Sequence, residues 1–469
     1  MVAGPRRSAV LAITGLPVFL VSLNLLVMAV AFPALQASFP QASRAELSWV
    51  LNGHNIVFGA LLIPAGRAAD RWGRRRVFAI GLGIFAAGSL VCGLAPDVPF
   101  LVVGRVVQGI GSALVLPSSL GLLLAAFSTR ERATAVTVWG AISSLGAALG
   151  PTLGASIVQA AQWRWVFFVY IPIAVASALL GRAYLTESRE AERTRLPDLA
   201  GVVLICLALA ALALGIVEGR DWGWLSGRVL LAFAVGGTLL PLFILRCLRH
   251  PEPLLNLSLF RIRTFSVANL AAFIFSVSFY GQVLVGILFL TSVWRYGLFA
   301  AALAITPTPV TAAIVGPLAG RVANRRGFRE LAIAGALAYA AGAIWLRLFA
   351  GAQASYVLTW LPAGVLLGVG IGICFPILGA ASVSAIPAAR FAVGGAVNQT
   401  ARQVGAVVGV ALAIAILGSA SAAAGLASFD AWFEVSAVIA VAAAAVSIAL
   451  GRPTLAVAPE VLVPEGAHP

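Results

Sequence analysis

The stretch Gly66-Arg67-Ala68-Ala69-Asp70-Arg71-Trp72-Gly73-Arg74-Arg75 has a second copy, Gly320-Arg321-Val322-Ala323-Asn324-Arg325-Arg326-Gly327-Phe328-Arg329, at an offset of 254 positions. Each copy lies between two long apolar runs and combines several arginines with glycines that permit a tight turn. A short arginine-rich loop between apolar runs is typical of the cytoplasmic face of a membrane protein. Its duplication predicts two related halves.

Composition places the chain in a bilayer. Of 469 residues, 61% are hydrophobic and 10% are charged, which is too little polar surface for a soluble globule of this size. The apolar runs reach the length of about 20 residues that a helix needs to cross the hydrocarbon core. We expect an all-α polytopic membrane protein with fourteen spans, at about 13–36, 47–67, 77–95, 98–127, 133–161, 164–182, 199–218, 226–246, 265–292, 297–320, 330–349, 356–376, 391–418 and 431–450.

The net charge of +15 raises the question of nucleic-acid binding. All 31 basic residues are arginine, and with the amino terminus inside, 23 fall on cytoplasmic segments, 6 on external segments and 2 within spans. Because segregation of positive charge to the inside follows from membrane insertion alone, we expect the lipid bilayer and no nucleic acid as partner. The distribution predicts a multi-pass protein of the cytoplasmic (inner) membrane with both termini cytoplasmic.

Two further matches support the internal repeat. In the predicted spans 4 and 12, Gly109, Gly111 and Pro117 correspond to Gly368, Gly370 and Pro376 at an offset of 259. In spans 5 and 13, Gly146 and Gly150 correspond to Gly405 and Gly409 at the same offset. The predicted architecture is six plus two plus six spans: a first half over 1–184, a hydrophilic linker with two inserted helices over 185–250, a second half over 251–452, and a cytoplasmic tail over 453–469.

The duplicated loop can be interpreted in two ways. A single copy could serve as a topology signal and nothing more. Two copies at matching places favour a joint, in which Asp70, surrounded by arginines, forms a charged latch that holds the halves together on the cytoplasmic side. The second copy has Asn324 at the equivalent position, so the predicted latch is asymmetric.

With these residues the sequence resembles the major facilitator superfamily, because Gly66, Asp70, Arg71, Gly73, Arg74 and Arg75 match its signature loop, with Asn324, Arg325 and Gly327 in the second copy. Fourteen spans resemble the drug:proton antiporter branch with QacA-like and EmrB-like exporters. Other stretches are similar to motifs of that branch: Leu101–Leu120 with Arg105, Gln108 and Gly109 in span 4, Trp163-Arg164-Trp165-x-Phe167 at the start of span 6, and Asn398, Arg402, Gln403 and Gly405 in span 13. The resemblance implies the major facilitator fold, with two pseudo-symmetric six-helix halves and alternating access.

Span 5 contains Gly146, Gly150, Pro151 and Gly154, which resemble the motif that the family associates with export. Glycines four residues apart let two helix backbones approach closely, and a proline removes one backbone hydrogen bond and bends the helix. The alternative is ordinary packing of small residues. Span 13 has Val410 in place of the proline, so the bend is predicted in one half.

Arg105 and Arg402 are placed inside spans, where an unpaired charge costs at least about 2.5 kcal/mol. We expect both to face the central cavity. The alternatives are that Arg105 snorkels to the outer interface and that Arg402 caps carbonyls of a neighbouring helix. Two cavity arginines without an embedded acid would favour a neutral or anionic substrate over a lipophilic cation.

The family pattern usually has an acid in span 1, and the matching position here is Asn24. None of the sixteen carboxylates lies in the middle of a span, so a proton-coupled carrier needs another group. His54 in span 2 is a candidate, since an imidazole exchanges protons near neutral pH. The alternative is a hydrogen-bonded cavity or packing residue. The proposed substrate and proton pathway comprises Asn24, His54, Arg105, Gln108, Asn398, Arg402 and Gln403.

The function predicted from these features is export of small amphipathic molecules by proton antiport. An uncoupled facilitator or importer of a neutral or anionic metabolite is the alternative, and a membrane sensor that transports nothing is a second. The sequence contains no HExxH or GxSxG cluster of an enzyme, and without lysine it has no phosphate-binding loop for ATP. Four isolated cysteines indicate no metal site. We expect no cofactor, a proton gradient as energy source, and a functional monomer.

Overall fold

The computed structural model describes residues 4–128, 131–189, 198–251, 253–386, 391–418 and 422–451. Within these ranges the chain is helical and contains no strand, and fourteen helical spans are long and apolar enough to cross a membrane. Both the all-α fold class and the number of spans are thereby confirmed. The expected tail over 453–469 lies outside the described residues, as does the linker over 190–197.

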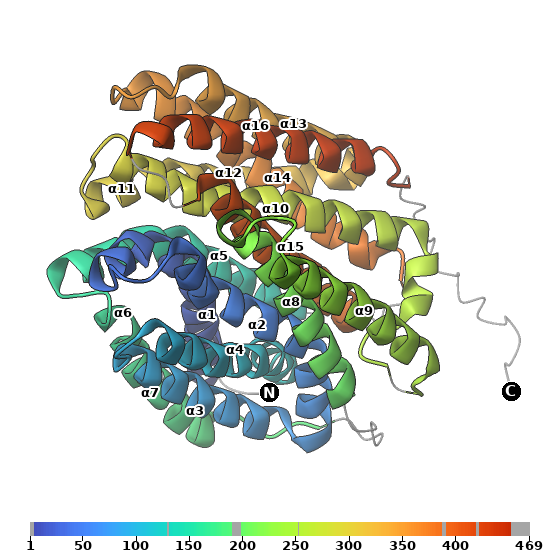
Figure 1. The fold of residues 1–469 in the computed structure, drawn as a ribbon. Helices are drawn as coiled ribbons and strands as arrows, with labels where there is room; N and C mark the ends of the chain where they lie inside the picture. The colour runs from blue at the N-terminus through green and yellow to red at the C-terminus, as the bar shows by residue number, and fades with distance from the viewer. Residues whose placement is uncertain are drawn as a thin grey trace, which may run out of the picture.

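The helices follow the predicted order of six, two and six spans (Figure 1). The first six spans are α1 (Gly4–Ser38), α2 (Arg44–Trp72), α3 (Arg74–Gly93), α4 (Val98–Ala126), α5 (Arg132–Ala160), and α6 (Trp165–Phe168) with α7 (Tyr170–Tyr184). The inserted spans are α8 (Leu199–Trp222) and α9 (Gly227–Arg249). The last six are α10 (Arg263–Ser292), α11 (Leu298–Ile305) with α12 (Pro307–Arg326), α13 (Phe328–Phe349), α14 (Leu361–Ser384), α15 (Phe391–Leu417) and α16 (Ala422–Ser447).

Several predicted boundaries were wrong, and three differ most. The first span was expected to begin at 13, but α1 begins at Gly4. The twelfth span was expected to end at Pro376, but α14 continues to Ser384, because a proline is tolerated inside a membrane helix whose neighbours satisfy the freed carbonyl. The last span was expected to begin at 431, but α16 begins at Ala422. It takes in the charged Asp430, whose carboxylate lies 3.8 Å from the guanidinium of Arg347 on α13.

The matched glycines make equivalent contacts in the two halves. A Cβ on Gly146 would overlap the carbonyl oxygen of Phe19 on α1, and a Cβ on Gly405 would lie 2.5 Å from that of Phe273 on α10. Gly111 approaches the backbone of α3 in the same way, and Gly370 that of α13. Each half therefore packs its fifth span on its first and its fourth on its third. The offsets of 254 and 259 relate residues in equivalent structural positions.

The inserted helix α8 lies along the seam between the two halves. Leu209 of α8 packs with Ile56 of α2 and Val407 of α15 in one apolar cluster. At one end Arg220 donates to the carbonyl oxygen of Ile416 on α15 at 2.7 Å. Figure 1 shows α8 and α9 in green beside the junction of the blue first half and the yellow-to-red second half.

A buried ion pair ties α8 to α9. The side chain of Asp198, which caps α8, is fully buried and lies 2.7 Å from Arg246 near the end of α9. Burial opposes its ionisation, but hydrogen bonds from Arg246 and from the backbone N–H of Gly201 outweigh that cost and hold the pKa of the Asp198 carboxyl below its ordinary value. The two inserted helices thus form a closed hairpin.

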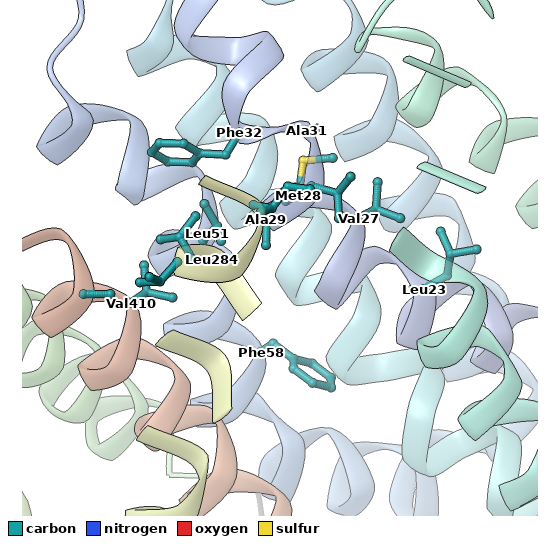
Figure 2. Packing of buried hydrophobic residues seen from close by; sticks show 14 of the residues in the cluster. Leu23, Val27, Met28, Ala29, Ala31, Phe32, Leu51, Phe58, Leu284 and Val410 are labelled. Carbon is teal, nitrogen blue, oxygen red and sulfur yellow. The ribbon is translucent and has the colours of Figure 1, made fainter. Parts of the chain in front are cut away.

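The apolar core continues from one half into the other. Figure 2 shows Leu284 of α10 and Val410 of α15 beside Leu51 of α2, with Phe32 and Met28 of α1 next to them. These side chains belong to one cluster of buried residues. Since lipid tails give no hydrophobic drive for helix association, such an interface depends on close packing.

Candidate functional site

Arg105 is the centre of a buried polar cluster in the first half. Its side chain is 1% exposed, although it lies on a membrane helix. Its Nε donates to the carbonyl oxygen of Val50 on α2 and its Nη1 to Oδ1 of Asn24 on α1, both at 2.8 Å. Nη1 also donates to Oε1 of Gln108, whose amide nitrogen donates to Ser89 on α3 at 2.9 Å. The guanidinium therefore joins the first four helices.

This geometry differs from the expectation that Arg105 faces the central cavity. Its hydrogen bonds point into the helix bundle of the first half. The side chain therefore does not extend to the outer interface, which was the alternative interpretation. In an apolar setting a charged donor takes the strongest acceptors within reach, and these are a backbone carbonyl of α2, the side-chain amide of Asn24 on α1 and that of Gln108 on its own helix.

Several polar atoms near Arg105 are buried without a hydrogen-bond partner among the described residues. They include both ring nitrogens of His54 and Nδ2 of Asn24. His54 is fully buried, stacks on Phe58, and lies against α4 beside Gly109, one helical turn from Arg105. Buried polar atoms are normally satisfied, so this gathering indicates a place where water or a proton is accommodated.

Asn52 and Ser89 were missed by the sequence analysis. Asn52 is fully buried in α2, and Ser89 accepts the hydrogen bond of Gln108. The signal was present, because a polar side chain within a membrane span is a candidate for function. The sequence, however, does not say which face of a helix meets α4.

Arg402 and Gln403 lie at the boundary between the halves. The guanidinium of Arg402 lies 3.8 Å above the ring of Phe375 on α14, and the Tyr280 hydroxyl of α10 is near both residues. Gln403 is fully buried against α2, where a Cβ on Gly59 would lie 2.8 Å from its own Cβ. Thr400, in the preceding turn of α15, also contacts the first half, because its hydroxyl donates to the carbonyl oxygen of Gly59 on α2 at 2.9 Å.

Asn398 belongs to the interior of the second half. It is 5% exposed and donates to Oδ1 of Asn269 on α10 at 3.2 Å. Asn269 in turn donates to the carbonyl oxygen of Phe265. The seven residues expected to form one pathway thus divide into a cluster inside the first half, a pair at the boundary, and Asn398 inside the second half.

The first copy of the duplicated loop turns at Gly73, whose φ of 103° favours glycine. Asp70 pairs with Arg74 at 2.8 Å within this loop. The carboxylate of Glu187, which follows the sixth span, accepts hydrogen bonds from the backbone N–H groups of Arg75 and Arg76 at the start of α3. An anion at a helix N-terminus is stabilised by the unpaired N–H groups there. The loop is thereby fastened to the end of its own half.

Other members of the loops lie as follows. Gly66 begins the last turns of α2, close to Pro117 of α4. Arg71 is in the last turn of α2 and Arg325 in the last turn of α12, so both positive charges face a helix C-terminus. Gly327 ends α12 with a φ of 85°, equivalent to the turn at Gly73. The side chain of Asn324 lies outside the described part of the chain.

The glycine-rich fifth span contacts both halves. Gly150 and Gly154 of α5 face α1, where added Cβ atoms would lie 3.1 Å from the Leu23 carbonyl oxygen and 2.9 Å from Val27. Pro151 lies inside the helix, which runs from Arg132 to Ala160. The neighbouring Thr152 shares a hydrogen bond of 2.9 Å with Thr306 of the second half. Span 5 is thus packed tightly on its own half and bonded to the other.

Two related bundles of six helices, each with one copy of the repeated loop and with polar residues buried among its helices, define a membrane carrier of the two-half type. A family model, the Major Facilitator Superfamily, matches residues 16–410. The chain belongs to this family, and the resemblance stated from its motifs is confirmed.

Relatives with assigned functions support the same family. The chain is 33% identical over 413 residues to the multidrug resistance protein Stp of Mycobacterium tuberculosis, covering 87% of this chain and 75% of that protein. It is 34% identical to a methylenomycin A resistance protein of Streptomyces coelicolor, covering 85% and 83% of the two chains. It is 32% identical to a tetracenomycin C resistance and export protein of Streptomyces glaucescens, covering 84% and 73%.

Among solved structures, a peptide transporter of the POT family crystallised with sulfate has a TM-score of 0.68, with 94% of each chain covered and 13% sequence identity. A second, autoinhibited peptide transporter of that family has a TM-score of 0.66 at 17% identity, with 94% and 96% covered. At such identities the likeness concerns the fold alone.

Proposed function

We propose that the chain is a secondary active exporter of small amphipathic molecules, such as drugs, antibiotics or natural products, driven by proton antiport. Membership in the family and relatives named for multidrug resistance, antibiotic resistance and export support the transported class. The observation that carries proton coupling is the buried cluster around Arg105, with the buried imidazole of His54 one helical turn away.

The chemistry of coupling follows from the position of His54. A proton on its imidazole adds a second positive charge near the buried guanidinium of Arg105, in a space without a carboxylate among the groups that bond to Arg105. Two buried like charges are unstable unless water or a rearranged helix relieves them. Uptake of a proton therefore favours a movement of α2 and α4, and release of the proton favours the packed arrangement.

The remaining features complete the proposal. The carrier works in the cytoplasmic membrane with both termini inside, as a monomer without a cofactor, by alternating access of its two halves. Energy comes from the proton gradient, not from ATP, and no nucleic acid takes part. The residues of the pathway are those around Arg105 together with Arg402, Gln403 and Asn398.

The experiment uses inside-out vesicles that contain the full chain and are free of ATP. A pH gradient, acid inside, is expected to drive uptake of a fluorescent drug, and adding the drug is expected to release protons. His54→Gln is expected to lower this proton release at least about tenfold while drug binding remains. Ser48→Ala, a buried change in the same helix, is the control, because the Ser48 hydroxyl donates to the carbonyl oxygen of Ala45 in its own turn. Unchanged proton release in His54→Gln excludes His54 as the coupling residue.

An uncoupled facilitator or importer is the second candidate, because Asn24 replaces the acid of the family pattern and accepts a hydrogen bond from Arg105 instead of forming an ion pair. Counterflow of labelled drug with and without a pH gradient separates the two: an exporter responds to the gradient, whereas a facilitator exchanges drug equally well in both. A non-transporting sensor would show binding with neither gradient-driven uptake nor counterflow.

A further inference from the structure

The inserted helix α8 contains a buried carboxylate that the proposed function does not use. Glu218 lies in the last turns of α8 and is 8% exposed. Among the described residues, no group donates a hydrogen bond to it and no cation pairs with it. A buried carboxylate that is ionised is normally held by hydrogen bonds or by a positive charge. Glu218 is therefore a candidate for a group that stays buried by binding a proton.

Glu218 lies at the outer end of the seam between the halves, where the outer end is the one remote from the duplicated loops. Val217 before it belongs to the same apolar cluster as Leu417 at the end of α15. Arg220 after it donates to the carbonyl oxygen of Ile416 on α15 at 2.7 Å. Further along α8, the seam is closed by the apolar cluster that joins it to α2 and α15. A charge that appears on Glu218 thus appears where both halves meet.

Two further carboxylates act on Glu218. Asp221 lies three residues along the same helix, and Glu46 lies in the first turn of α2. The position of Glu46 is fixed, because its carboxylate accepts a hydrogen bond of 2.8 Å from the backbone N–H of Ser43 at the start of α2. A like charge nearby disfavours the ionised form of a carboxyl group. Both acidic neighbours of Glu218 therefore oppose its ionisation.

The positive groups of the surrounding helices are bonded elsewhere. Arg44 of α2 and Arg220 of α8 donate to backbone carbonyl oxygens at the end of α15, at 3.1 and 2.7 Å. The facing end of α9 contributes Arg228, whose guanidinium lies 5.7 Å from the centroid of a tryptophan ring. Residues 404–417 of α15 include no charged side chain. The closed seam thus provides Glu218 with two like charges and no counter-charge among the described residues.

A cavity of about 690 Å³ opens at the same end of the molecule. Its lining includes Glu46 and Trp49 of α2 and Asp97 at the start of α4. Trp49 also packs on the apolar cluster that joins α2 to α8 and α15, so the cavity reaches the edge of the seam. A space of this size with carboxylates in its wall accommodates water. Because Glu46 belongs to this wall and acts on Glu218, external water can supply protons close to Glu218.

We propose that Glu218 binds the proton that enters from the external side, and that its protonation holds the outer end of the seam closed. The carboxylate takes one proton from external water and becomes a neutral carboxyl, which can remain buried. The ionised carboxylate instead needs water, which an opened seam admits. Proton capture and closure of the outer side are thereby linked.

This inference rests on the proposed function as a proton antiporter and names the place where the proton enters. It complements the role of His54, which lies about two helical turns inward of Glu46 along α2. Glu218 receives the proton at the outer end, whereas His54 acts inside the first half.

The first test measures protonation without transport. Purified full-length chain in lipid nanodiscs is treated with dicyclohexylcarbodiimide, which reacts with protonated carboxyl groups in apolar surroundings, and peptide mass spectrometry gives the labelled fraction of each carboxylate. At about pH 7, where a free glutamate is ionised, labelling of Glu218 is expected to exceed that of the exposed Glu330 on α13 at least about tenfold, and to fall as the pH rises. Equal labelling of the two residues overturns the proposal.

The second test uses inside-out vesicles, whose lumen corresponds to the external side. Drug uptake by the parent chain is expected to rise as the lumen is acidified at constant outer pH. Glu218→Gln cannot bind the proton and should reduce this response at least about tenfold, whereas Glu218→Asp should retain it with a shifted midpoint. Glu330→Gln, the same chemical change at an exposed position, is the matched control and should respond as the parent does. A response of Glu218→Gln equal to that of the parent overturns the proposal.

Melting curves check the fold of each variant. If Glu218→Gln unfolds, Glu218→Asp and the labelling of the parent chain decide the question, since neither requires that variant.

Two outcomes separate this inference from the proposed function. Preferential labelling of Glu218 in a chain that moves no drug in vesicles supports the proton site and contradicts the exporter. Gradient-driven uptake with the same pH response in the parent and in Glu218→Gln, together with labelling of Glu218 no greater than that of Glu330, supports the exporter and overturns Glu218 as the place where the proton enters.

Discussion

At equivalent positions of the repeat, the first half contains Arg105 and the second half contains Gly364. Arg105 fills its space and bonds to α1, α2 and its own helix, whereas Gly364 leaves a crevice with apolar walls. The backbones around both places are packed alike, since Gly109 and Gly368 make the same close approach to the second span of their half. A duplicated fold can therefore keep its helix packing while one copy fills a position with a charged side chain and the other leaves it without a side chain.

The largest effect is expected from Arg105→Ala. Its removal leaves the carbonyl oxygen of Val50 and the side-chain oxygens of Asn24 and Gln108 without their donor, at a cost of roughly 1–3 kcal/mol for each buried group. Gradient-driven drug uptake in vesicles should fall to background. Arg105→Lys should recover a part of it, since one ammonium cannot reach all three acceptors. Full uptake by Arg105→Ala would mean that the charged side chain of the first half has no role that Gly364 of the second half lacks.

The second prediction tests what the halves share. Gly146→Leu and Gly405→Leu each force a side chain into the backbone of the first span of its half, Phe19 in one case and Phe273 in the other. Overpacking typically costs about 1–3 kcal/mol, so both variants should melt several degrees below the parent chain, by similar amounts. Melting curves of the purified proteins check this. A large shift in only one of them would show that the repeat is not equivalent in packing.

The third prediction concerns the two loops. Asp70→Asn removes the acid that pairs with Arg74 and should reduce uptake several-fold, whereas Asn324→Ala removes a neutral group and should have little effect. The rates are compared at equal amounts of protein in the membrane. Equal losses of uptake would mean that the Asp70–Arg74 pair gives the first loop no role that the second loop lacks, and that the predicted asymmetric latch is wrong.

The smallest effect is expected at Asn24. Asn24→Leu deprives Arg105 Nη1 of one acceptor and should lower the melting temperature by a few degrees, in keeping with a loss of about 1–3 kcal/mol. Asn24→Asp retains the acceptor and should melt near the parent temperature, with an altered pH dependence of uptake because the guanidinium gains a carboxylate partner. Identical melting of all three proteins would mean that Asn24 does not support Arg105.

Periodic apolar runs, arginine placement and the repeated loop were sufficient to predict the fourteen spans, the two related halves and the family. These features are local or act through the bilayer, which imposes helix length and charge sidedness without reference to tertiary contacts. The predicted close approaches of Gly146 and Gly405 also follow from small residues four apart. Residue chemistry alone marked Arg105, His54 and Gln108 as unusual.

Only the tertiary structure decided how these residues are used. It turned Arg105 inward, added Ser89 to its cluster, separated Arg402 and Asn398 from it, and placed α8 along the seam between α2 and α15. It also showed that Gly364, which has no side chain to attract notice, leaves room beside Thr308 and Trp360. Rotation of a helix about its axis and the choice of its neighbours are set by packing of the whole bundle, because lipid contacts any apolar face equally well.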